Sequence, residues 1–190
     1  MRYPKGHREE THRRIVDEAA RAIRVAGIDG VSIGDLMARL GLTHGGFYAH
    51  FENKDVLVAE ACEHAVTNAQ EELYEGTGAM PRDEALSLVM RRYLSRTHRD
   101  HPEGGCVGAA IGNDLSRAAP VVRGTFSRIV RSLAERLRTV LPAARDTEDD
   151  ALATLSTMVG AMVLARAVDE RELSDRILRA ARSALTKADE

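Results

Sequence analysis

Apolar residues recur with the period of an α-helix in almost every patterned segment of this 190-residue chain. At positions 15, 19, 22, 23 and 26 they repeat at intervals of three and four, which places them on one helical face. Gly27 follows as a natural helix end. No segment alternates apolar and polar residues convincingly, as a half-buried strand does. The pattern predicts an all-α fold.

Capping residues and breaks divide the chain into about nine helices. Ser32, Thr43 and Asn53 each precede a helical pattern and are good N-caps, because their side-chain oxygens accept a free backbone N–H. After the first helix we expect others over residues 33–40, 44–50, 54–75, 81–97, 109–118, 120–141, 148–168 and 172–187. Residues 98–108 read as a loop, and Ala151–Val168 is apolar nearly all round, which predicts burial on more than one side.

Composition is that of an ordinary soluble domain, with 44% apolar and 29% charged residues and a formal charge of −2. Cys62 and Cys106 are too few for a disulfide framework. The polar N-terminus does not resemble an export signal, and the apolar run at 158–165 is far shorter than the roughly 20 residues of a membrane span. We therefore expect a cytoplasmic protein without a membrane partner, a metal or a cofactor.

The stretch GLTHGGFYAHFENK, residues 41–54, carries the most specific signal. Gly45 and Gly46 each cost a helix about 1 kcal/mol relative to alanine. A helix, a short turn containing Gly41 and a second short helix fit a helix-turn-helix over residues 32–50, in which the second helix enters the DNA major groove. Glycines there let backbone and DNA approach closely.

Aromatic and polar residues of this stretch divide between two faces. Phe47 and Phe51 are four positions apart and are predicted to fill the core of the module. Tyr48, His50 and Lys54 then point elsewhere, and their hydroxyl, imidazole and ammonium groups are donors that phosphates accept. The alternatives are that Tyr48 is an edge of the core and that His50 is a plain surface histidine.

With these residues in view, VSIGDLMARLGLTHGGFYAHFENKDVLVAEA resembles the N-terminal signature of the TetR family of transcriptional repressors, closely over residues 12–61. The rest is similar to the family in architecture only. The resemblance implies a three-helix DNA-binding domain over residues 1–53 and a six-helix effector-binding and dimerisation domain over residues 54–190.

Position by position, the resemblance implies contacts with DNA phosphates and with bases. Phosphates are expected at Ser32, Thr43, Tyr48, His50 and Lys54, and bases at His44, Gly45 and Ala49, with Gly46 in the same helix and Gly34 on the supporting helix. Gly34 is equally well explained as a tolerated glycine. The glycines and Ala49 offer no side-chain hydrogen bonds, so base recognition falls on His44 and Thr43.

Positive charge gathers at the N-terminus of this otherwise slightly acidic chain. Residues 1–25 hold seven Lys or Arg against four Asp or Glu, a net charge of +3, and Arg2, Lys5 and Arg8 precede the first acid. Phosphate neutralisation by such side chains supplies most non-specific affinity for DNA. We expect this arm to follow the DNA backbone or to enter a minor groove.

Two sets of residues in the body are candidates for an effector pocket and a dimer interface. The pocket candidates are Met90, Tyr93, Cys106, Phe126, Met158 and Met162, although methionines at helical spacing are more often core. The ending GAMVLARAVDERELSDRILRAAR is similar to the two-helix dimer segment of the family. The interface candidates are Leu155, Val159, Met162, Val163, Leu173 and Ile177.

Cys106 leaves three chemical alternatives open beside that of a small buried apolar residue. His98, His101 and Cys106 fit no strong zinc spacing, and no orienting group marks a Cys–His nucleophile. A sensor thiol needs a lowered pKa, which nearby histidines permit. The sequence thus predicts a homodimeric, non-enzymatic repressor that binds a palindromic operator and is released by a small-molecule effector. The alternatives are a thiol-based sensor regulator acting through Cys106 and a small helical enzyme or adaptor with an idle helix-turn-helix.

Overall fold

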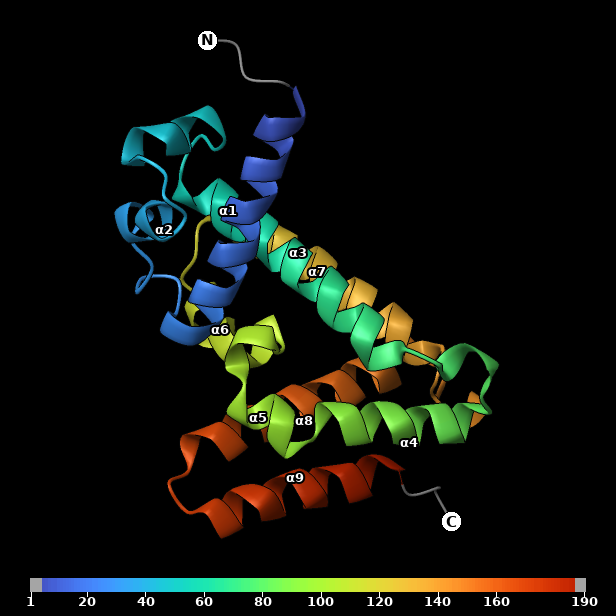
Figure 1. Ribbon diagram of the computed structural model, residues 1–190. Coiled ribbons are helices and arrows are strands. Elements are labelled where there is room, and N and C mark those ends of the chain that lie inside the picture. The colour runs from blue at the N-terminus through green and yellow to red at the C-terminus, as the bar shows by residue number, and fades with distance from the viewer. Residues whose placement is uncertain (1–4, 187–190) are drawn as a thin grey trace.

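The computed structural model describes residues 5–186, and this part of the chain is entirely helical (Figure 1). The prediction of an all-α fold is confirmed. The α-helices are α1 Lys5–Ala26, α2 Ile33–Arg39, α3 Lys54–Tyr74, α4 Arg82–Tyr93, α5 Arg96–Asp100, α6 Val107–Leu115, α7 Pro120–Arg138, α8 Glu148–Ala167 and α9 Arg171–Thr186. Four short 3-10 segments lie between them: η1 His44–Ala49, η2 Thr77–Ala79, η3 Pro102–Gly104 and η4 Ala143–Arg145.

The three predicted N-caps near the N-terminus are all present. Ser32 Oγ accepts from the Asp35 amide at 3.4 Å, Thr43 Oγ1 from the Gly46 amide at 3.2 Å, and Asn53 Oδ1 from the Val56 amide at 3.0 Å. Gly41 has a φ of 71°, a left-handed conformation that glycine adopts without strain. It turns the chain between α2 and η1.

The structure corrects two predicted helices. Residues 44–49 form a 3-10 helix rather than an α-helix: the Gly46 and His50 amides bond to carbonyls three residues back, and the adjacent glycines favour α-helix weakly. The helix expected over residues 81–97 ends at Tyr93. Within the same expected helix a second one, α5, begins after the cap Ser95, and it ends at Asp100 in the segment read as a loop.

The long helix α3 connects the two ends of the molecule. It begins beside η1, packs on α1 and then on α7, and reaches the region of α4 (Figure 1). One core cluster joins α1, α2, η1 and the first half of α3 to α6 and α7. A second joins α4, α8 and α9 to parts of α6 and α7. The body therefore shares helices with the N-terminal module.

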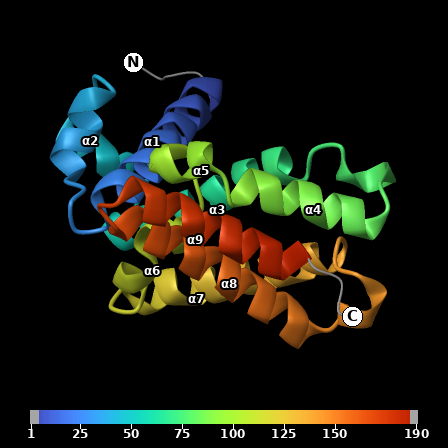
Figure 2. The ribbon, with the colours of Figure 1, turned by 90° about the horizontal axis from the view of Figure 1, so that it is seen from below.

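Helices α8 and α9 pack side by side at the end of the molecule opposite η1. Helix α9 is the lowest helix in Figure 1 and lies in front of α8 in Figure 2. By length and composition alone α8 is apolar enough to cross a membrane, the one such helix in the part of the chain described. It packs against α6, α7 and α9, as a core helix does.

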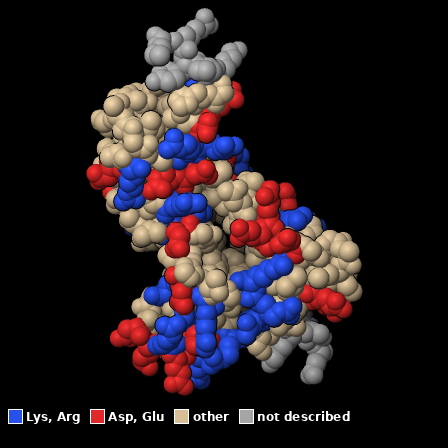
Figure 3. Space-filling model, in the orientation of Figure 1, with Lys and Arg blue, Asp and Glu red and all other residues tan. Residues whose placement is uncertain are grey.

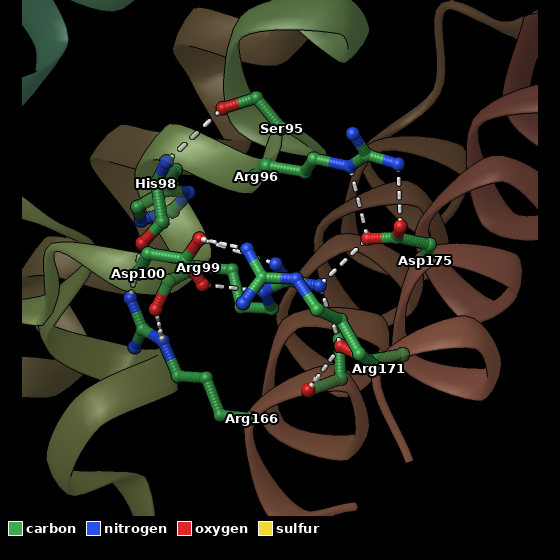
Figure 4. A network of polar contacts seen from close by, with 10 residues as sticks. Ser95, Arg96, His98, Arg99, Asp100, Arg166, Arg171 and Asp175 are labelled. Atoms are coloured by element: carbon green, nitrogen blue, oxygen red, sulfur yellow. Dashed lines mark hydrogen bonds and ion pairs between the residues drawn. The ribbon is translucent and has the colours of Figure 1, made fainter.

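A buried arginine holds α5 onto this pair of helices. Arg99 donates to Ser174 Oγ and to Asp175 Oδ1, both at 2.8 Å, and to Asp100 at 2.7 Å (Figure 4). Arg96 also pairs with Asp175. The break after Tyr93, where no glycine or proline stands, lets α5 turn toward this network.

Candidate functional site

The helix-turn-helix is positioned by apolar residues beneath it. Phe47 and Phe51 are 0% and 2% exposed and stack with their ring centroids 5.4 Å apart. Leu36 and Met37 of α2 are buried in the same cluster. This packing fixes η1 on the module despite its short length.

The residues predicted to contact DNA lie on the opposite, accessible side. Tyr48 is 59% exposed, and its ring meets that of His44 edge-on. Gly46, His50 and Lys54 are half-buried, and the other candidates are exposed: Ser32, Gly34, Thr43, His44, Gly45 and Ala49. The structure therefore leaves each of the ten candidates at least partly open to solvent.

The two glycines of η1 have different surroundings. A Cβ on Gly45 would meet no atom within 4 Å, so nothing in the protein requires glycine there. A Cβ on Gly46 would lie 3.4 Å from Thr43 Oγ1 and 3.8 Å from Met37. Gly46 is thus explained in part by packing, whereas the close approach of another molecule remains the hypothesis for Gly45.

His50 lies in a cluster that joins η1 to α1. Its ring is 5.8 Å from that of His12, which stacks on Phe51 and bonds to Glu60 at 2.5 Å. Burial, together with His12 and Arg8, lowers the pKa of His50, so the imidazole is neutral at pH 7. It can offer a hydrogen bond to a phosphate but little charge.

Positive charge reaches this surface from α1 rather than from η1. The tip formed by η1 is almost free of Lys and Arg in Figure 3, and charged side chains form a band below it. Arg8 donates to the Ala49 carbonyl at 2.7 Å, which places a guanidinium at the end of η1. Of the predicted arm, Arg2 lies outside the described residues.

A cavity of about 520 Å³ lies in the body, within the range of small-molecule sites. Helix α3 forms one wall, α4 and α5 another, and the segment 104–107 with Leu133 the rest. The lining residues are Ala65, Val66, Ala69, Gln70, Glu72, Leu73, Arg92, Tyr93, Ser95, Thr97, His98, His101, Gly104, Gly105, Cys106, Val107 and Leu133.

Only two of the six predicted pocket residues, Tyr93 and Cys106, line this cavity. Met90, Met158 and Met162 are buried in the second core cluster, and Phe126 packs against the first. The sequence analysis missed the contribution of α3, because the apolar side of an amphipathic helix does not reveal which of its residues face a cavity.

His98 organises the inner wall of the cavity. Its Nδ1–H donates to the Tyr93 carbonyl at 2.7 Å, and its Nε2 accepts from the Cys106 amide at 2.9 Å. Both ring nitrogens are therefore engaged, and the imidazole must be neutral for Nε2 to accept. Burial lowers the pKa of His98 in agreement with this.

His98, His101 and Cys106, weighed above as a metal site or a Cys–His pair, have other partners in the structure. His101 pairs with Glu103 at 3.2 Å, away from the bonds of His98. In the described part of the chain, no three His, Cys, Asp or Glu side chains are grouped to hold a metal ion. Cys62 is buried, Cys106 is half-buried, and both are free.

Small and apolar residues of α8 and α9 form a second accessible feature, which we call the α8–α9 stripe. On α8 the stripe consists of exposed or half-buried positions at intervals of three and four: Ala153, Ser156, Thr157, Gly160, Val163, Leu164 and Ala167. Leu173 and Ile177 continue it on α9. Val163, Leu164 and Leu173 are 42%, 56% and 38% exposed.

Three of the six predicted interface residues, Val163, Leu173 and Ile177, belong to this stripe. Leu155 and Met162 do not: they are 8% and 0% exposed because they face the interior of the same chain. Val159 is half-buried and packs against the second core cluster, as Ile177 also does, so both lie at the margin of the stripe. The exposed large apolar residues of the stripe are thus Val163, Leu164 and Leu173, and the interface itself stays a prediction.

Comparison with known proteins agrees with this geometry. Residues 15–61 match the family model described as bacterial regulatory proteins, tetR family. The HTH-type transcriptional regulator AcrR of Shigella flexneri is 32% identical over 82 residues, which are 43% of this chain and 38% of AcrR. The chain therefore matches well under half the length of this relative.

Solved structures match along nearly the whole chain. A TetR transcriptional regulator from Chloroflexus aurantiacus J-10-FL is 26% identical, with a TM-score of 0.78 over 95% of this chain and 94% of that one. AibR, solved in complex with isovaleryl coenzyme A and operator DNA, is 17% identical, with a TM-score of 0.65 over 92% and 97% of the two chains. This second match concerns the fold alone.

Proposed function

Because the chain belongs to the TetR family of DNA-binding transcriptional regulators, we propose that it is a cytoplasmic repressor that binds a palindromic operator as a homodimer and leaves it when a small molecule fills the cavity. In this proposal residues 1–53 recognise DNA and residues 54–190 bind the effector and the second subunit. No catalytic role is assigned.

The observation that carries this proposal is the course of α3. Its first residue, Lys54, stands beside the exposed residues of η1, and its later residues Ala65, Ala69 and Leu73 line the cavity. The helix has 21 residues and is therefore about 32 Å long. A ligand that displaces its far half changes the position of Lys54 and η1.

Such a displacement regulates binding only if the ligand has different affinities for two arrangements of the protein. Two recognition elements related by a two-fold axis read half-sites about one helical turn apart. A change in their separation therefore weakens the complex with DNA. AibR, whose fold is similar, was solved with both an acyl coenzyme A and operator DNA.

Binding of the purified protein to fragments of its own genomic neighbourhood, at several salt concentrations, tests this function. We expect saturable binding to one palindromic fragment, weakened steeply by salt and abolished by Tyr48→Ala combined with Lys54→Ala. Arg131→Ala, an exposed change on α7, is the control and leaves binding intact. Equal binding by the double variant and the wild type would contradict the proposed DNA surface.

A further inference from the structure

Tyr93 lines the cavity, and its hydroxyl is buried behind the surface without a hydrogen-bond partner. The side chain is 6% exposed, and its oxygen is one of the few buried polar atoms without a partner in residues 5–186. Its polar neighbour is the Cys106 thiol, a weak acceptor with which it forms no hydrogen bond of good geometry. A buried hydroxyl without a partner is unfavourable, and a ligand oxygen that accepts its hydrogen bond would remove that cost.

Two arginines place positive charge behind the same wall. Arg166 donates to the carbonyls of His98 and Arg99, and Arg24 donates to the carbonyl of Glu103. Neither forms an ion pair with a carboxylate among the described residues, and Arg24 Nε and Arg166 Nη1 are buried without partners. A Cβ on Gly105, which lines the cavity, would lie 3.0 Å from Arg166 Nη2, so this guanidinium stands directly behind the wall.

The rest of the cavity is suited to an apolar body. Ala65, Val66, Ala69 and Leu73 of α3 face it, with Val107 and Leu133 on the other side. Arg92 also lines the cavity but donates to the carbonyls of Leu73 and Glu75, and the acidic lining residue, Glu72, is exposed to solvent. The remaining polar lining residues are Gln70, Ser95, Thr97, His98 and His101. Thus the inner end offers a hydrogen-bond donor and positive charge, and the walls offer apolar contact.

We propose that the effector of this protein is a small apolar carboxylate, whose oxygen accepts a hydrogen bond from the Tyr93 hydroxyl in the field of Arg24 and Arg166. This inference rests on the proposed function, because it names the ligand class of the effector cavity. The Tyr93 hydroxyl favours ligands that carry an oxygen able to accept its hydrogen bond. The two arginines favour an anion over a neutral carbonyl, because Glu103, the carboxylate that interacts electrostatically with both, is exposed to solvent, which screens its charge.

Three probes of matched skeleton test this proposal: hydrocinnamate, the ketone benzylacetone and the hydrocarbon butylbenzene. Calorimetric titration of the free protein should give the order hydrocinnamate, then benzylacetone, then butylbenzene. In Tyr93→Phe the affinity for hydrocinnamate should fall roughly tenfold or more, the range for a hydrogen bond to a charged group, and that for butylbenzene should not change. Tyr74→Phe, a buried tyrosine outside the cavity, is the control and should bind like the wild type.

Arg166 separates the effect of charge from that of the hydrogen bond. Arg166→Met should reduce the preference for hydrocinnamate over benzylacetone, because Arg24 then acts alone, whereas Arg166→Lys should keep it; an unchanged preference in Arg166→Met overturns the role of the charge. Equal affinity of Tyr93→Phe and wild type for hydrocinnamate, or a wild type that prefers either neutral probe, overturns the proposal. Absence of binding of all three probes also overturns it. Operator binding of the same preparation without a probe is measured separately, so failure of the proposed function is distinguished from failure of this inference.

Discussion

Leu164→Asp provides the most direct test of the α8–α9 stripe as the dimer interface. Leu164 is 56% exposed in the single chain, so the substitution leaves the core of the protomer intact. Complete burial of a leucine stabilises by about 1.5–3 kcal/mol, and the exposed half of Leu164 therefore contributes about 1–1.5 kcal/mol in a dimer. A two-fold interface contains the residue twice, which gives about 2–3 kcal/mol.

This loss raises the dissociation constant of the dimer by about 30- to 150-fold, as a lower bound, because the buried aspartates add a desolvation cost. Sedimentation equilibrium over a range of protein concentrations measures the constant directly. Val121→Asp is the matched control, since Val121 is 48% exposed on α7 outside the stripe. If the Leu164→Asp protein dimerises as tightly as Val121→Asp, the stripe is not the interface.

Three further changes test other parts of the structure. Phe47→Ala removes a fully buried ring and should destabilise the protein by about 3–5 kcal/mol, lowering Tm by roughly 10 °C in a thermal melt; an unchanged Tm would contradict the packing of η1. Burial lowers the pKa of His98, so near and below pH 6.5 the unfolded chain takes up a proton that the folded chain resists. The free energy of unfolding, measured in urea between pH 5 and 8, should therefore fall as the pH falls, by up to about 1.4 kcal/mol per pH unit. The His98→Asn variant should lack this component and His101→Asn should keep it; the same slope in both variants would contradict it. Cys106→Ala should retain operator binding in a mobility-shift assay, and loss of binding would favour a role for the thiol in the regulator.

Local chemistry explains why the N-terminal module was predictable. The caps Ser32, Thr43 and Asn53 bond to amides three residues away, so each is encoded within a few positions. The spacing of Phe47 and Phe51 likewise placed both rings in the core. The 3-10 form of η1 was not predicted, because the choice between neighbouring helical forms depends on small backbone energies at Gly45 and Gly46.

The body was less predictable because its features depend on contacts between distant residues. No glycine or proline marks the break after Tyr93 in the sequence. In the structure this break accompanies hydrogen bonds from Arg99 to Ser174 and Asp175, more than 70 positions away. Apolar periodicity correctly predicted that Met158 and Met162 lie in a helix and face its apolar side. It does not distinguish a position in the core from one in a cavity wall. The cavity could not be predicted because its walls, α3 and the segment 104–107, are distant in the sequence and meet only in the fold.

Helix α3 connects the proposed effector site to the proposed DNA surface, so the effects of ligand and operator on each other's affinity must be equal. If occupation of the cavity weakens operator binding by a given factor, the operator must weaken ligand binding by the same factor. The fraction of cavities filled then depends on how many protein molecules are on DNA as well as on the ligand concentration. A cell that holds this protein in excess of its operators would consequently need more ligand for release, because the free protein binds ligand more tightly and its unliganded fraction reoccupies the DNA.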